Sequence, residues 1–313
     1  MNKREAVLGL LDPGSTPGYT PAAFFLHFDP MYHRGQAAVD KHLEYFRYTG
    51  MDLVKIQYER TFPHLPEIRR PADWPQMPCY GLEFYEAPLG VLAGLVKAAK
   101  PEALVIQTLY SPFMCAGQTV GAEMLADHIR QDSEGVKRGM QVITDSLLRF
   151  VKECIRLGVD GFYTSTQGGE SGRFGGSPLF NECIRPYELV LMQEINRACG
   201  FNILHVCDYH LPYSDLTPFV DYPGHVVNAS LELTGGKISP QAVASLFGRP
   251  YMGGLERKGV IATGSVSEVQ KVVEGILRAA PERFILGADC TVPSETSWDN
   301  LKAAISTAHA YRR

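Results

Sequence analysis

The chain has 313 residues, of which 45% are hydrophobic and 20% charged, as in globular proteins built from two domains or one large barrel. Its formal net charge of -4 provides no basic surface for nucleic acid or anionic lipid. We expect no membrane span, because no apolar run is long enough, and no signal peptide, because charges flank a short N-terminal apolar stripe. Seven irregularly spaced cysteines indicate a reducing cytoplasm, where thiolates are available for metal.

Short apolar runs alternate with helix-length segments along the chain. The predicted strands are residues 20–27, 52–58, 103–109, 160–165, 201–207, 224–229, 250–255 and 283–288. The predicted helices are residues 2–11, 36–48, 87–99, 134–157, 182–198, 266–279 and 298–311. Parallel strands need helix-length connections, so eight strand–helix units predict a single-domain (β/α)8 TIM barrel over residues 1–313. The helix at 2–11 would close its bottom.

A doubly wound sheet is the rival architecture, and the missing glycine-rich fingerprint after the first strand counts against it. Residues 59–86 contain five prolines and are predicted to form a long loop after strand two. In a barrel, a long loop at that end commonly serves as a lid or a binding wall.

Polar residues stand at the carboxyl end of every predicted strand, where barrel active sites form. We expect His27, Asp29 and Glu256 to serve catalysis. The predicted substrate-binding residues are His33, Tyr58, Gln107, Gln167, Asp208, His210, Asn228 and Asp289. For any one of these residues the alternative is a solvated loop or a helix cap, and for Asp29 before Pro30 it is a turn cap.

The most informative motif is His205-Val206-Cys207 at the end of a predicted strand, followed far downstream by Cys290 after the last strand. Residues two apart on a strand point to the same face, so His205 and Cys207 can both approach one metal ion. Three protein ligands leave one position open, which is the pattern of catalytic zinc. The alternative is that the cysteines are packing residues and His205 a satisfied polar residue.

The second half of the chain also resembles a known family. The resemblance rests on the stretches Asp221 to Asn228, Tyr251 to Lys258 and Phe284 to Leu301. In this order they resemble the uroporphyrinogen decarboxylase superfamily, and within it the zinc-dependent corrinoid methyltransferases such as the methylcobamide:coenzyme M enzymes. The resemblance implies the same barrel and a zinc ion held by His205, Cys207 and Cys290.

The resemblance further implies a methylcorrinoid as methyl donor or acceptor, with a small thiol or related compound on the other side. Because the chain has no Asp-x-His-x-x-Gly corrinoid motif, we expect a separate corrinoid protein or free cobalamin to deliver that group. Glu232 lies in an interval comparable to that of a glutamate in cobalamin-independent methionine synthase, so it is a candidate fourth ligand. Whether the chain forms a homodimer stays open.

Two departures from the family pattern bear on function. Asp208 follows Cys207 where the methyltransferases usually have glycine, so we expect a different pocket beside the metal. The segment after the first strand offers only Arg34 where true decarboxylases carry arginines that grip the substrate carboxylates. The alternative functions are a metal-free decarboxylase of a tetrapyrrole or other polycarboxylate and, third, a non-catalytic corrinoid- or tetrapyrrole-binding protein.

Overall fold

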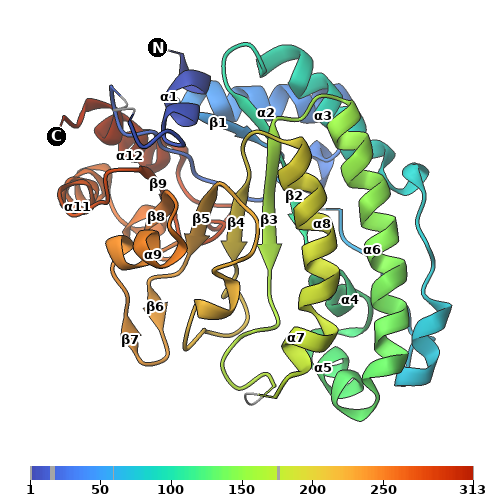
Figure 1. The fold of residues 1–313 in the computed structure, drawn as a ribbon. Helices are drawn as coiled ribbons and strands as arrows, with labels where there is room; N and C mark the ends of the chain where they lie inside the picture. Colours follow the sequence, from blue (N-terminus) through green and yellow to red (C-terminus); the bar gives the residue numbers. More distant parts are fainter. Residues whose placement is uncertain (1, 15–17, 59, 175–176, 313) are drawn as a thin grey trace.

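The computed structural model describes residues 2–14, 18–58, 60–174 and 177–312. Within these residues a parallel sheet curls around the core, and helices cover its outside (Figure 1). Its strands, in spatial order, are β1 (Leu53–Lys55), β2 (Leu104–Tyr110), β3 (Gly161–Thr166), β4 (Ile203–Val206), β5 (Val226–Ala229), β8 (Tyr251–Leu255) and β9 (Phe284–Ala288). A short antiparallel hairpin, β6 (Glu232–Leu233) with β7 (Gly236–Lys237), follows β5.

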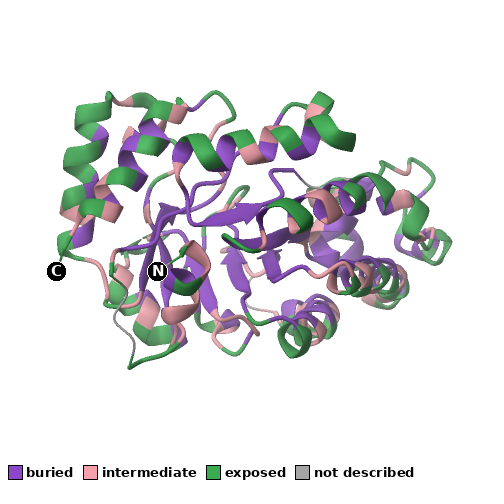
Figure 2. Ribbon diagram, turned by 90° about the horizontal axis from the view of Figure 1, so that it is seen from above, coloured by how far each residue is buried: buried purple, intermediate pink, exposed green. Residues whose placement is uncertain are grey.

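The longer helices carry the predicted apolar stripes. They are α2 (Gly35–Thr49), α3 (Glu86–Ala99), α6 (Ser133–Arg156), α8 (Arg185–Ala198), α11 (Val266–Arg278) and α12 (Trp298–Ala310). The shorter helices are α1 (Lys3–Gly9), α4 (Pro112–Val120), α5 (Ala122–Gln131), α7 (Leu179–Cys183), α9 (Pro240–Phe247) and α10 (Val260–Thr263). Figure 2 shows the strands of the large sheet almost entirely buried and the helices buried on the side that faces the sheet. This is the two-layer pattern of a parallel barrel.

The predicted first strand, residues 20–27, is not a regular strand, and this expectation is wrong. The segment does lie between β9 and β1, because the Ala23 amide donates to the Leu286 carbonyl and the Asp52 amide to the Ala22 carbonyl. It forms only one bridge, between Ala22 and Leu286. Side chains replace ladder partners here: Asp52 accepts the Ala22 amide at 2.8 Å and the Gln57 side chain accepts the Leu26 amide at 3.2 Å.

Helix α1 lies at the end of the sheet where the strands begin (Figure 1). Lys3 donates to the carbonyl of Met51 just before β1, and Arg4 pairs with Asp160 just before β3 at 2.7 Å. The proline-rich stretch after β1 contains two 3-10 helices, η2 (Pro71–Gln76) and η3 (Leu82–Tyr85). Trp74 of η2 is fully buried, and its ring nitrogen donates to His128 of α5. This excursion is therefore packed onto the barrel.

No described helix combines the length and the apolar character needed to cross a membrane.

Candidate metal centre

Three buried side chains meet at the carboxyl end of the sheet. His205 lies on β4, Cys207 follows that strand directly, and Cys290 follows β9. One ligand atom from each lies within 4.8 Å of the others, and this is the group among the described residues that could hold a metal ion. His205 and Cys207 share a face because they are two residues apart on extended chain. Strand order places β9 three strands from β4, and the curl of the sheet brings Cys290 across.

His205 carries the clearest sign of a missing partner. Its side chain is 1% exposed, yet outside the group that it forms with the two cysteines neither Nδ1 nor Nε2 has a hydrogen-bond partner in the described part of the chain. Buried polar groups are nearly always paired, because an unpaired one loses its hydration without compensation. A metal ion bound to one of the two ring nitrogens would be the partner of that nitrogen. The residues present therefore fit a zinc ion of the His/Cys/Cys kind.

The two thiols interact with each other. Contact with Cys207 holds the pKa of the Cys290 thiol well below its usual value. The same contact, together with burial, raises the pKa of Cys207 well above its usual value. A bound metal ion would leave both thiols deprotonated, since coordinated thiols lose their protons.

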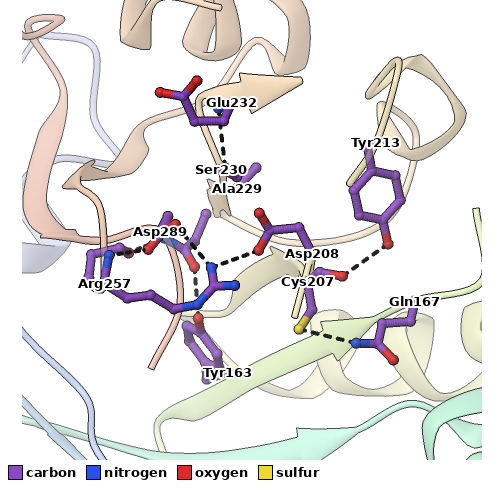
Figure 3. A network of polar contacts seen from close by, with 12 residues as sticks. Tyr163, Gln167, Cys207, Asp208, Tyr213, Ala229, Ser230, Glu232, Arg257 and Asp289 are labelled. Atoms are coloured by element: carbon purple, nitrogen blue, oxygen red, sulfur yellow. Dashed lines mark hydrogen bonds and ion pairs between the residues drawn. The ribbon is translucent and has the colours of Figure 1, made fainter. Parts of the chain in front are cut away.

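A shell of polar contacts orients the ligands (Figure 3). Gln167 donates from Nε2 to Cys207 Sγ at 3.4 Å, and Tyr213 donates to the Cys207 carbonyl at 3.2 Å. Tyr163 stacks on His205 with ring centroids 5.0 Å apart. The Tyr163 hydroxyl donates to Asn228 Oδ1 at 2.7 Å. Second contacts of this kind fix the geometry of metal ligands.

Arg257 connects the two loops that carry the cysteines. Its Nη1 donates to Asp208 at 2.9 Å and to Asp289 at 3.0 Å, and its backbone amide donates to Asp289 at 2.7 Å. Figure 3 shows the guanidinium group between the two carboxylates. Burial raises the pKa of Asp289 to about 6. Asp208 follows Cys207 and Asp289 precedes Cys290. The bridge through Arg257 therefore holds the two loops, and with them the two thiols, in fixed positions relative to each other.

A cavity of about 440 Å³ opens beside the three ligands. His205, Cys207 and Cys290 all line it, so a bound metal ion would face the cavity. Its other walls come from β2 with α4, from β3 and from the loops after β4 and β9. They comprise His27, Thr61, Tyr110, Phe113, Met114, Gly117, Gln118, Ala122, Tyr163, Ser165, Gln167, Tyr209, His210 and Thr291. Most of the wall surface is apolar, as in sites for small ligands.

Of the residues predicted to serve catalysis or bind substrate, His27, Gln167 and His210 line this cavity. Asp208 stands behind Cys207, paired with Arg257. Asp289 and Glu256 line a second, smaller hollow of about 260 Å³ beside the β6–β7 hairpin. Glu256 itself is exposed.

Other predicted site residues lie away from the described cavity wall. Asp29 is exposed and accepts the Met31 amide at 2.9 Å, which is the turn-cap arrangement. His33 is half-buried and stacks on the buried ring of Tyr58, with centroids 4.1 Å apart. Asn228 is buried inside the barrel, where its Nδ2 donates to two backbone carbonyls.

Two predicted site residues, Gln107 and Glu232, are still to be placed. Tyr110 lines the cavity, and Gln107, three residues earlier on β2, therefore faces the opposite side of the sheet. Its Nε2 donates to the Thr108 carbonyl. Glu232 is exposed on β6 and pairs with Lys237, so the structure does not bring this candidate fourth ligand to the metal group.

Sequence reasoning missed Arg257 and the α4 wall with Phe113 and Met114. A signal for Arg257 existed, because an acidic Asp208 beside a predicted metal site calls for a cation. For the α4 wall the chain offers an N-cap, Ser111 before Pro112, whose hydroxyl accepts the Met114 amide.

Comparison with solved structures shows the same fold. A methyltransferase from Methanosarcina mazei superimposes with a TM-score of 0.76 at 11% identity, covering 98% of each chain. A B12-independent methionine synthase from Shewanella sp. W3-18-1 has a TM-score of 0.56 at 12% identity, covering 93% of this chain and 96% of that one. A protein described as a vitamin-B12 independent methionine synthase from Listeria monocytogenes gives 0.56 at 12% identity, covering 94% and 97%.

The comparison with curated proteins gave no match. The family model for uroporphyrinogen decarboxylase, in contrast, matches residues 46–311, which is most of the chain and includes all three candidate ligands. This protein belongs to the uroporphyrinogen decarboxylase family.

Proposed function

We propose that this protein is a zinc-dependent methyltransferase that moves a methyl group between a corrinoid and a thiol or related acceptor. One observation carries the proposal. His205, Cys207 and Cys290 converge at the cavity, and outside this group both ring nitrogens of the buried His205 lack a partner among the described residues. Two thiolates and one imidazole form a soft ligand set, which favours binding of a thiol over activation of water.

Zinc bound at these three residues would keep a thiol substrate deprotonated at the inner end of the cavity. Neighbouring residues of the chain hold the ligands in position. Gln167 and Tyr213 fix the position of Cys207, and the Tyr163 ring fixes the plane of His205. The aromatic walls exclude water, so a thiolate held there is poorly solvated and more nucleophilic. The open end of the cavity leaves room for a corrinoid to approach.

The test uses purified protein, free methylcobalamin and a panel of small thiols. We expect slow demethylation that requires zinc, followed as the change from the methyl-Co(III) spectrum to the Co(I) spectrum. Cys290→Ala should abolish it, because the variant loses one ligand and one negative charge at the metal. Cys154→Ala, which removes a buried cysteine of α6, serves as the matched control and should retain the activity.

Activity that survives Cys290→Ala would overturn the proposal. Decarboxylation of uroporphyrinogen by metal-stripped protein would favour the metal-free decarboxylase, which the family description brings forward. Spectral change on binding cobalamin or porphyrinogen without turnover would favour a binding protein.

A further inference from the structure

We infer that the acceptor is an uncharged thiol with an apolar body, and that the cavity discriminates against thiols carrying a carboxylate or sulfonate. This inference rests on the proposed function, since it names the substrate class of the same site. It follows from three features of the cavity: its walls, the cations nearest to it and the net charge of the ligand set.

The side chains that form the cavity walls suit an apolar ligand. Tyr110, Phe113, Met114, Tyr163 and Tyr209 come from four separate segments and face one space of about 440 Å³. Aromatic rings and a methionine give a large contact area that adapts to a hydrocarbon body. An ionised group placed against the aromatic part of these walls loses hydration that the rings do not restore.

Two arginines that touch the wall aromatics are committed to carboxylates. Arg257 lies over the Tyr209 ring and pairs with Asp208 and Asp289. Arg173 lies over the Phe113 ring and forms two hydrogen bonds to Glu170, at 2.6 and 3.1 Å, with both side chains almost fully buried.

Two further cations near the wall are also engaged. Lys55 lies over the ring of Tyr163 at 5.3 Å and donates to the Ile56 carbonyl inside the barrel. Arg60, next to Thr61, donates to the Phe84 carbonyl and stacks on the Phe84 ring. Recruiting Arg173, Lys55 or Arg60 to a ligand anion would break an existing contact of the folded protein. Arg257 has no partner for its buried Nε among the described residues, but it already lies between two carboxylates that repel an anion.

The ligand set adds no positive charge. A divalent ion with two thiolates and a neutral imidazole is formally uncharged, so binding a thiolate already brings a net charge of minus one. A second anion on the same ligand would lie within a few ångströms of that charge in a poorly hydrated space, where repulsion is strong. Besides the two histidines His27 and His210, the polar wall groups, such as Ser165, Gln167 and Thr291, carry no charge and suit an uncharged polar function on the ligand.

The test compares benzyl mercaptan with para-carboxybenzyl mercaptan, two thiols that differ by one carboxylate. In cobalt-substituted protein, the thiolate-to-cobalt absorption band reports binding at the metal. In metal-free protein, calorimetry reports binding in the cavity alone. We expect the carboxylated thiol to bind at least about tenfold more weakly in both forms.

A charge introduced into the wall should change this preference. Met114→Lys places a cation on the cavity side of α4, and Met114→Gln is the uncharged control of similar length. We expect Met114→Lys, but not Met114→Gln, to reduce the discrimination against the carboxylated thiol. Equal or tighter binding of the carboxylated thiol to the unmodified protein, or no binding of either thiol, would overturn the inference. Failure to bind cobalt would instead contradict the proposed function and leave the metal-free comparison readable.

Discussion

The two ends of the barrel treat their buried polar groups in opposite ways. At the end where strands begin, Asp52 accepts hydrogen bonds from the Ala22 amide, the Tyr19 hydroxyl and His309 at 2.7 to 2.8 Å. At the end where strands finish, His205 is as deeply buried, but outside the group with Cys207 and Cys290 its ring nitrogens have no partner within the described chain. The first arrangement is complete in itself and supports stability. The second is complete only with something bound, as expected for the functional end of a barrel.

The largest expected effect is on metal binding. Cys290→Ala and Cys207→Ala should each lower zinc affinity by at least about a thousandfold, because each removes one of three ligands. The metal-free forms should unfold at a denaturant concentration close to that of the metal-free parent. Competition with a chromophoric chelator measures the affinity, and Cys154→Ala is the control. If the variants bind zinc as tightly as the parent protein, the proposed difference between the two ends of the barrel is wrong.

Asp52→Ala should have the converse effect. Its side chain is fully buried and serves three donors besides an ion pair with Lys3, so its loss leaves several groups unpaired. We expect a decrease of about 3 kcal/mol in the free energy of unfolding, measured in urea. Zinc affinity should be unchanged under native conditions. A variant that loses zinc while staying folded would show that the two ends are coupled.

Glu188 of α8 is intermediate between these extremes. Its Oε2 accepts hydrogen bonds from Thr166 and Tyr222, and the Ser111 hydroxyl also interacts with the carboxylate, but these contacts offset only part of the cost of burial. Burial raises the pKa of this carboxyl from an ordinary 4.5 to about 7. Between these values the folded state binds more protons than the unfolded chain, so stability should fall as pH rises from 4.5 to 7 and then level off.

This dependence should amount to roughly 3 kcal/mol and be absent from Glu188→Gln. Urea unfolding of both metal-free proteins at a series of pH values gives the difference directly. Parallel curves for the two proteins would contradict the assignment.

The smallest expected effect concerns the bridge behind the ligands. Arg257→Gln removes the contacts to Asp208 and Asp289 but no metal ligand. We expect zinc affinity to fall by about tenfold, because the loops carrying Cys207 and Cys290 are held less firmly. Arg257→Lys should recover part of the loss, since it restores the charge without the full hydrogen-bonding geometry. If Arg257→Gln leaves the zinc affinity unchanged, the bridge has only a structural role.

The convergence of the three candidate ligands could be predicted because most of its information is local. His205 and Cys207 share a face by strand geometry alone, and Cys290 follows a strand that any parallel barrel ends at the same side. The order of strands and helices was readable for the same reason. The segment at 20–27 was mistaken for a strand because its amides are satisfied by Asp52 and Gln57, and those contacts exist only in the folded barrel.

The positions of the substrate-binding residues depend on information that the spacing of residues in the sequence does not contain. Gln107 is not at the mouth, because it lies within β2 three residues before Tyr110 and strand alternation turns it to the side opposite the cavity. Glu232 is in a plausible interval of the chain, yet the β6–β7 hairpin carries it to the surface. Arg257 joins residues 49 and 32 positions away, a contact set by tertiary structure.

Zinc-edge X-ray absorption on the purified, zinc-loaded protein tests the central claim most directly. The account predicts about one zinc per chain with two sulfur ligands near about 2.3 Å and the remaining ligands nitrogen or oxygen. Addition of benzyl mercaptan should raise the sulfur count to three. Protein that binds no zinc, or a zinc site without sulfur ligands, would contradict it.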